Sequence, residues 1–271
     1  MTTTSSTNAG LSASTWAITG AAGRIATVLR GGLTDVGELR LFDLAPITDL
    51  AAHEHAGELD ITALEETTEA LRGADGVVHL AAIADEADLF AIAQVNIVGT
   101  LTLFEAARRA GVSRVVFASS NHATGMYPVS TLVDPAMPVR PDTYYGMSKV
   151  TGEAIGRLYV DKFGLEVACL RIASFAERPR ERRHLSTWAS YGDTIRAVRA
   201  AMLAPALGFA IYYVASANRD LFWDMSAGEA IGFVPLDRAE AYGTDLGGPD
   251  YELQGGPHAA LDYTLERQLA R

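Results

Sequence analysis

The sequence predicts an α/β fold in which a doubly wound parallel sheet is covered by helices on both faces. Two observations carry this prediction. Short apolar runs alternate with helical stretches along most of the 271 residues, and a glycine-rich turn joins the first apolar run to the first helical stretch. Strands of such sheets are buried on both faces, and ligands bind at their carboxyl ends.

Six apolar runs, short and rich in β-branched residues, are expected as buried strands. They cover residues 16–19, 39–43, 76–82, 114–119, 166–172 and 209–215. Between them, apolar residues at helical spacing predict helices, and Gly111 is a good C-terminal stop for the one that precedes it. The predicted helices cover residues 23–33, 62–72, 89–110, 143–163 and 190–204.

We expect the chain to form three parts. Residues 1–13 are rich in Thr, Ser and Ala and are expected as a flexible tail, without the basic and apolar pattern of a leader. Residues 14–175 form the dinucleotide-binding core, which includes the catalytic residues. Residues 176–271 are richer in Pro and Gly, and they are expected to form a small substrate-binding region, continuous with the core and lid-like over the site.

Composition excludes several classes of function. The 22 Lys and Arg residues face 33 Asp and Glu residues, and the net charge of −11 disfavours nucleic acid or an anionic membrane as a partner. Apolar stretches are interrupted by charge or glycine short of the ~20 residues that a membrane span needs. The single cysteine, Cys169, is expected in the core, so no disulfide framework forms. These features are typical of a cytoplasmic protein.

The glycine-rich turn is the first motif with a chemical meaning. Residues 20–26 read GAAGRIA and follow the first strand directly. Gly20 and Gly23 let the backbone turn tightly and approach a pyrophosphate, whose charge is then stabilised by the N-terminus of the next helix. Ala26 is a tolerated variant of the third glycine. The pattern predicts a Rossmann-like dinucleotide site.

The second strand ends in Asp43, where a carboxylate predicts the choice of cofactor. An acidic side chain at this point accepts hydrogen bonds from the adenosine ribose hydroxyls and repels a 2′-phosphate, so NAD is favoured over NADP. Arg24, a cation in the glycine-rich turn, is a weaker argument for NADP.

A tyrosine and a lysine form the second motif. Tyr145 and Lys149 lie four residues apart on a predicted helix and therefore share one face. A phenol normally ionises near pH ~10, and an ammonium group beside it is expected to lower that pKa. With the Ser120 hydroxyl at the end of a neighbouring strand, the pair is suited to removing a proton from an alcohol.

These residues, together with Asn96 and segments 117–122, 144–149, 185–188 and 216–218, give the chain a family resemblance. Over nearly its whole length it resembles the extended short-chain dehydrogenases/reductases, and among them the bacterial uronate dehydrogenases. The resemblance implies oxidation of the anomeric carbon of galacturonate or glucuronate to an aldarolactone, with reduction of NAD. It implies that Tyr145 is the base, that Lys149 lowers its pKa and binds the nicotinamide ribose, and that Ser120 positions the reacting oxygen.

The resemblance also implies which residues contact the two ligands, and a metal site is not expected because no cluster of Asp or Cys residues supports one. Cofactor contacts carried over from the family are Gly20, Gly23, Arg24, Ile25, Asp43, Leu44, Asp60, Ile61, Leu80, Ala81, Ala82, Ile83, Lys149 and Ser174. Substrate contacts are Ser120, Asn121, His122 and Arg183. A guanidinium matches the C6 carboxylate as a planar two-pronged donor, and Arg182 is the alternative to Arg183.

Some features depart from the family or stay open. Ala84 stands where related enzymes place a serine within reach of sugar hydroxyls. Trp188 and Trp223 could wall the pocket or fill the core, while His53 and His55 are expected in a surface loop and not at a metal. The helices over 89–110 and 143–163 make dimers in this superfamily, so a homo-oligomer is expected.

Two other functions remain compatible with the sequence. One is a sugar-nucleotide epimerase or dehydratase on the same scaffold, which would need room for a nucleotide group. The other is a non-catalytic dinucleotide sensor. The sensor is disfavoured because Tyr145, Lys149 and Ser120 are all present.

Overall fold

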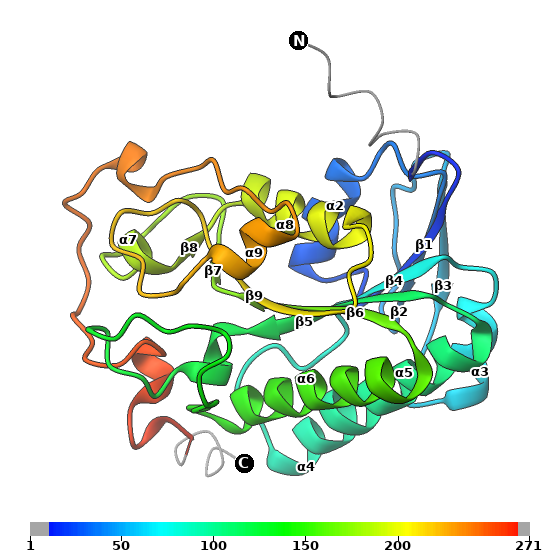
Figure 1. The fold of residues 1–271 in the computed structure, drawn as a ribbon, viewed down its shortest axis with the longest axis horizontal. Helices are drawn as coiled ribbons and strands as arrows, with labels where there is room; N and C mark the ends of the chain where they lie inside the picture. The colour runs from blue at the N-terminus through cyan, green and yellow to red at the C-terminus, as the bar shows by residue number, and fades with distance from the viewer. Residues whose placement is uncertain (1–10, 265–271) are drawn as a thin grey trace.

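The structure, a computed structural model, describes residues 11–264. Seven strands form one parallel sheet in the order β3-β2-β1-β4-β5-β6-β9 (Figure 1). This confirms the predicted doubly wound sheet. The strands are β1 Thr15–Thr19, β2 Glu38–Asp43, β3 Glu54–Glu58, β4 Gly76–His79, β5 Arg114–Ser120, β6 Glu166–Ile172 and β9 Phe209–Val214.

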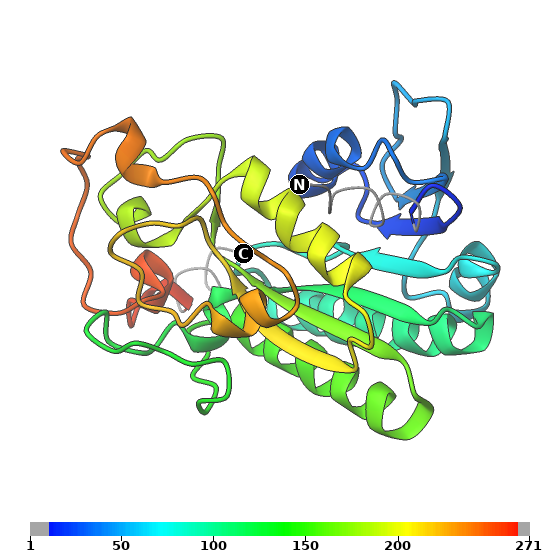
Figure 2. The same cartoon turned by 45° about the horizontal axis from the view of Figure 1, so that its top comes forward.

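Helices cover both faces of the sheet, as Figures 1 and 2 show. On one face lie α2 (Arg24–Gly32) and α8 (Tyr191–Leu203); on the other lie α3 (Leu64–Leu71), α5 (Gly99–Ala110) and α6 (Tyr144–Phe163). The strand order reverses between β1 and β4, and such a reversal opens a crevice at the carboxyl ends of the strands.

Alternate residues of each strand pack into two separate cores, as the pleat requires. On β1, Ile18 joins the core under α2 and α8, whereas its neighbour Ala17 joins the core under α5 and α6. On β5, Val116 and Phe117 divide in the same way. The strands therefore read as continuous apolar runs.

The helix predicted over 89–110 forms, but its middle is a wider turn. It comprises α4 (Leu89–Ile92), the π-helical η1 (Ala93–Val98) and α5. Within η1 the buried Asn96 accepts the Ile83 N–H at 2.8 Å and donates to Ser148 Oγ at 3.0 Å. Turns of this kind are frequent at functional sites. Here the turn fixes the loop after β4 to α6.

This helix passes a simple test of length and composition for a membrane span, although Gly99 breaks its apolar run as expected. Leu89–Ala110 has 22 residues and a hydropathy of 1.5, enough by length and composition to cross a membrane. Gly99 and the charged Glu105, Arg108 and Arg109 interrupt its apolar sequence, and the amide of Asn96 and the hydroxyl of Thr100 are buried and hydrogen-bonded, the latter to His79. In the structure the helix covers one face of the sheet.

Two further expectations need correction. The strand predicted over 76–82 ends at His79, because residues 80–83 turn away as a loop beneath the glycine-rich turn. A surface loop was expected at His53 and His55, but His55 lies in β3. As an edge strand, β3 needs no apolar run, and its buried Glu54 pairs with Arg30 of α2 at 2.7 Å.

Residues 176–264 add to the core and also cover the carboxyl end of the sheet. Helix α8 and strand β9 follow residue 175 and complete the main fold. The division of the chain at this residue into a core and a substrate-binding region stays a prediction. Trp188, Trp223 and Cys169 are buried, so all three are core residues. The remaining elements are short: η2 Asn121–Thr124, β7 Ser174–Phe175, α7 His184–Thr187, β8 Trp188–Ala189, α9 Ser226–Ala230, η3 Ala239–Tyr242 and η4 Gly256–Ala259.

The predicted tail over residues 1–13 falls mostly on residues 1–10, which lie outside the described residues. Leu11 is 2 % exposed and belongs to the core. The described chain is therefore packed from its first residue.

Candidate active site

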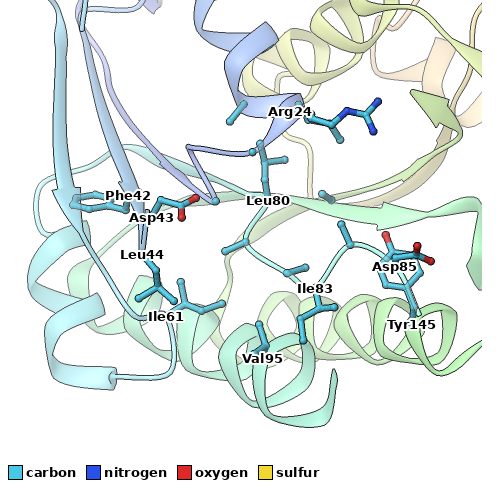
Figure 3. A pocket seen from close by; sticks show the side chains of 18 of the residues that line it. Arg24, Phe42, Asp43, Leu44, Ile61, Leu80, Ile83, Asp85, Val95 and Tyr145 are labelled. Atoms are coloured by element: carbon cyan, nitrogen blue, oxygen red, sulfur yellow. The ribbon is translucent and has the colours of Figure 1, made fainter. Parts of the chain in front are cut away.

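A cavity of about 870 Å³ lies at the carboxyl ends of the central strands, as Figure 3 shows. Every predicted cofactor contact except Lys149 lines it. At one end Asp43, Leu44 and Ile61 gather, and at the other lie Asp85 and Tyr145 (Figure 3). The cavity is elongated in a way that suits a dinucleotide. Its predicted lining residues are Gly20, Gly23, Arg24, Ile25, Asp43, Leu44, Asp60, Ile61, Leu80, Ala81, Ala82, Ile83 and Ser174.

The glycine-rich turn has the backbone geometry that a phosphate cradle needs. Gly20 has a φ of +72°, and a Cβ there would overlap the backbone of Ala81 on the next strand's loop. Gly23 then caps α2, whose first N–H groups have no partner within the helix. A free helix N-terminus stabilises negative charge, so the residues present fit the pyrophosphate of a dinucleotide.

Asp43 stands where the second strand ends, and both of its carboxylate oxygens accept backbone hydrogen bonds. Oδ2 accepts from the Ala22 N–H at 3.0 Å and Oδ1 from the Ala45 N–H at 2.9 Å. Arg24 lies apart from it, on the other side of Leu80 (Figure 3), where it donates to the Phe175 carbonyl at 3.2 Å. The Arg24 guanidinium is therefore not placed to bind a 2′-phosphate beside Asp43, so it does not favour NADP.

Ser120, Tyr145 and Lys149 come together at the other end of the cavity. Ser120 ends β5, and Tyr145 and Lys149 lie in the first two turns of α6. Thr143 caps that helix by accepting the Gly146 N–H at 2.9 Å. Lys149 Nζ lies 5.5 Å from the centre of the Tyr145 ring. The lysine and the serine are each 4 % exposed, so the cluster is largely screened from water.

The pKa of Tyr145 departs from the expectation that Lys149 lowers it. Burial raises the pKa of Tyr145 to about 12, although the hydrogen bond with Ser120 acts in the other direction. Burial also lowers the pKa of Lys149 to about 8. In the protein alone the pKa is raised because loss of hydration is the largest effect on this phenol, and the lowering by Lys149 stays a prediction. At neutral pH Tyr145 is a neutral phenol and Lys149 is still mainly an ammonium.

The short turn η2 carries two of the predicted substrate contacts. His122 lines the cavity, its ring meets Tyr145 edge-on at 6.0 Å, and its Nδ1 bonds to Asp142 Oδ2 at 2.7 Å. Asn121 is 4 % exposed, and in the described part of the chain its side-chain nitrogen has no hydrogen-bond partner. A buried donor without a partner is costly, so it favours a ligand atom at this point.

Arg183 is the arginine of its charged run that turns inward. Burial lowers its pKa, and it donates to Ser174 Oγ at 2.9 Å and to the Gln254 carbonyl at 2.7 Å. It lines a second cavity of about 360 Å³ and reaches the main one through Ser174. Arg182, the alternative, is exposed and pairs with Asp250 at 3.0 Å. The carboxylate-binding role of Arg183 stays a prediction.

Several polar or aromatic residues in the lining were not predicted: Phe42, Thr62, Asp85, Gln94, Phe175 and His258. Asp85 directly follows the loop after β4 and could have been found by its position. Phe175 packs below the Arg24 guanidinium at 6.0 Å. His258 comes from the end of the described chain, where no motif spacing connects it to the site.

A phosphate cradle and Tyr145 in one cavity suit the transfer of a hydride between an alcohol and a dinucleotide. Comparisons with known proteins agree with this chemistry. Residues 16–194 match the family described as NAD dependent epimerase/dehydratase.

Among similar proteins, the uronate dehydrogenase of Agrobacterium fabrum is 42 % identical over 226 residues, covering 83 % of this chain and 85 % of that protein. A mutant uronate dehydrogenase from Agrobacterium tumefaciens, solved in complex with NAD, is 38 % identical, with a TM-score of 0.86 over 91 % of this chain and 97 % of that one. A glucuronic acid dehydrogenase from Chromohalobacter salexigens is 35 % identical, with a TM-score of 0.89 over 93 % and 99 % of the two chains.

Proposed function

The chain belongs to the NAD-dependent epimerase/dehydratase family, and on this premise we propose that it oxidises the anomeric carbon of a hexuronic acid to the aldarolactone, with reduction of NAD. Galacturonate and glucuronate are the substrates. The observation that carries the proposal is the likeness to uronate dehydrogenases over most of the chain, at 42 % identity to one of them. A cavity that joins a phosphate cradle to Tyr145 supports it.

Tyr145 acts as the base in its phenolate form: the phenol first releases its own proton to solvent, and the phenolate then takes the proton from the C1 hydroxyl. Ser120 bonds to the phenol and also holds the reacting oxygen, so proton and hydride leave along fixed directions. Lys149, an ammonium 5.5 Å from the Tyr145 ring, favours the phenolate once the proton begins to move. NAD, when bound, supplies the hydride acceptor and a cationic ring that favours the phenolate further.

The substrate lies between Tyr145 and the cavity wall opposite the glycine-rich turn. The unpartnered side-chain nitrogen of Asn121 and the imidazole of His122 contact its hydroxyls. The Arg183 guanidinium holds the C6 carboxylate; its burial and its bond to Ser174, a lining residue, support this role. A planar guanidinium offers two parallel hydrogen bonds to a carboxylate.

The protein acts in the cytoplasm as a homo-oligomer. Large apolar side chains lie exposed on the helices of one face: Phe90 is 74 % exposed, and Leu101, Leu158 and Phe163 are between 44 % and 50 % exposed. Pairing of α5 and α6 with a second copy would bury them. Light scattering on the purified protein measures the mass; a monomer at micromolar concentration contradicts this part of the proposal.

The activity is tested by following NADH formation with galacturonate, glucuronate, galactose and UDP-glucose, each with NAD and with NADP. We expect turnover of the two uronates with NAD, and little with galactose or UDP-glucose. Turnover of UDP-glucose instead would favour a nucleotide-sugar enzyme. Binding of NAD without turnover of any substrate would favour a sensor.

A further inference from the structure

A second imidazole lies over the first at the Tyr145 end of the cavity. His258, in the turn η4, lines the same cavity as His122 and Tyr145. The rings of His258 and His122 are 4.3 Å apart, centre to centre. Nε2 of His258 bonds to Asp85 Oδ1 at 3.0 Å, and Figure 3 shows Asp85 beside Tyr145. Neither His258 nor Asp85 has a part in the mechanism above.

Each imidazole is held by a carboxylate through one nitrogen, which fixes the position of its proton. Asp142 bonds to Nδ1 of His122, and Asp85 bonds to Nε2 of His258. A neutral imidazole that donates through one nitrogen presents the other as an acceptor. Burial, with a smaller contribution from His122, lowers the pKa of His258, so its ring is neutral at pH 7. Its Nδ1 is therefore an acceptor, and it has no partner in the described part of the chain.

The segment that carries His258 is anchored to the core and not loosely laid over the site. Gln254 is fully buried, accepts from the Trp223 indole at 2.9 Å and donates to the Thr131 carbonyl at 2.7 Å. The Gly255 N–H donates to the Gly125 carbonyl at 2.8 Å, and a Cβ on either glycine would overlap Asp142. The segment therefore closes over the carboxylate that orients His122.

We propose that His258, held by Asp85, determines specificity by accepting a hydrogen bond from one ring hydroxyl of the sugar acid. The inference rests on the proposed function and adds a contact to it. A sugar presents several hydroxyl donors, and a fixed acceptor selects the epimer whose hydroxyl points at it. Asp85 acts through His258: it keeps the proton on Nε2 and so leaves Nδ1 as the acceptor.

The test combines a variant that keeps the ring with substrates that lack one hydroxyl. His258→Phe preserves the contact with His122 but removes the acceptor. We expect kcat/KM for galacturonate to fall about 5- to 100-fold, the effect of leaving one polar group unpaired. The affinity for NAD, measured by calorimetry, should stay the same. Leu261→Ala is the matched control, since this side chain follows on the same segment and is 90 % exposed.

The 2-, 3- and 4-deoxy galacturonates then locate the contact. One of them, which lacks the contacted hydroxyl, should be a poor substrate for the wild type, and its kcat/KM should not fall further in His258→Phe. For the other two, His258→Phe should lower kcat/KM by the same factor as for galacturonate. Asp85→Asn should also lower kcat/KM for galacturonate, and the same deoxy substrate should carry no further penalty in this variant. An unchanged kcat/KM in His258→Phe, or an equal loss on all four substrates, overturns the inference. A wild type that oxidises no uronate overturns the proposed function, and the inference with it.

Discussion

The buried carboxylate of Glu86 accepts a hydrogen bond from the backbone N–H of Tyr145 at 2.9 Å. The first N–H groups of a helix have no partner within it, and a carboxylate there is also favoured by the helix dipole. Thr143 satisfies one such group of α6, and Glu86 satisfies another. Through this bond the loop after β4 is joined directly to the residue proposed as the base.

Glu86→Ala should therefore lower both stability and turnover. Loss of the acceptor leaves a buried N–H without a partner, at a cost of about 1–3 kcal/mol. This corresponds to a fall of roughly 2–10 °C in Tm for a chain of this size. Circular dichroism on heating measures the Tm, and kcat should fall with it, since Tyr145 is no longer held in place.

Glu86→Gln is the informative companion, because its amide oxygen can still accept the hydrogen bond. It should recover most of the Tm. The exposed Glu252 provides the control, and Glu252→Ala should behave as the wild type. If Glu86→Ala melts at the wild-type temperature, the hydrogen bond does not support the helix.

Tyr145→Phe removes the hydroxyl and keeps the ring. We expect NAD to bind as in the wild type and kcat to fall by roughly 10²–10⁴-fold, the usual contribution of a positioned base. Tyr144→Phe is the matched control, because the neighbouring tyrosine is out of register with Lys149. Near-normal turnover in Tyr145→Phe would exclude this residue as the base.

The buried Lys149 should make the stability of the protein depend on pH in a defined window. Its pKa is about 8 in the folded chain against 10.5 ordinarily, so between these values the unfolded chain binds more protons than the folded one. Stability attributable to this group therefore rises as pH increases from 8 to about 10.5, and below pH 8 the full cost of the buried charge is present. The difference corresponds to about 3 kcal/mol.

Lys149→Met isolates that contribution, since it keeps the chain length and carries no charge. Urea unfolding at pH 7, 8, 9 and 10 should show the wild type gaining stability relative to Lys149→Met as pH rises. Titration of Tyr145 contributes equally to both proteins, apart from its coupling to Lys149. A difference that is constant with pH would mean that the lysine is not desolvated as the structure has it.

Local patterns in the sequence predicted the sheet and the cofactor end of the site. The apolar strands, the turn at Gly20 and the carboxylate at Asp43 each depend on neighbours within a few residues. Strand β3 was missed because an edge strand needs no apolar run, and its residues are mostly polar. The π-turn at Asn96 was missed because its cause is a bond to a distant loop.

The other end of the site depends on contacts between residues far apart in the sequence. His258 reaches the cavity only because Gln254 is anchored beneath Trp223. The pKa of Tyr145 was expected to fall because the sequence reveals the nearby Lys149 but does not reveal that the phenol is buried. Burial is a property of the folded chain, and it is the largest cause of the raised pKa.

Asp43→Ala should weaken NAD binding and relax the exclusion of NADP. The carboxylate is expected to accept hydrogen bonds from the ribose hydroxyls, and it also bonds to the Ala22 and Ala45 N–H groups, so the glycine-rich turn loses a support as well. We expect the KM for NAD to rise about tenfold or more. Asp43→Asn separates the two effects, since it keeps one oxygen for the backbone. Equal use of NADP and NAD by the wild type would contradict the assigned role.

The arginine run gives a test of the carboxylate contact with a neighbouring residue as its control. If Arg183 holds the C6 carboxylate, Arg183→Ala leaves that charge unpaired in a partly dry cavity, at a cost on the order of 2–5 kcal/mol. The kcat/KM for galacturonate should then fall by tens to thousands of times. Arg182 is exposed and pairs only at the surface with Asp250, so Arg182→Ala should change little.

Galactose, which has no carboxylate, separates a binding role of Arg183 from a structural one. The slow turnover of galactose should be nearly the same in the wild type and in Arg183→Ala. If Arg183 has a structural role instead, the substitution lowers the turnover of galactose and galacturonate together. Arg183 also bonds to Ser174 and to the Gln254 carbonyl, so the Tm must be measured beside the kinetics. Arg183→Lys should recover part of the loss, because an ammonium is a point charge and cannot make two parallel hydrogen bonds. Equal losses on both substrates would place the carboxylate on another residue.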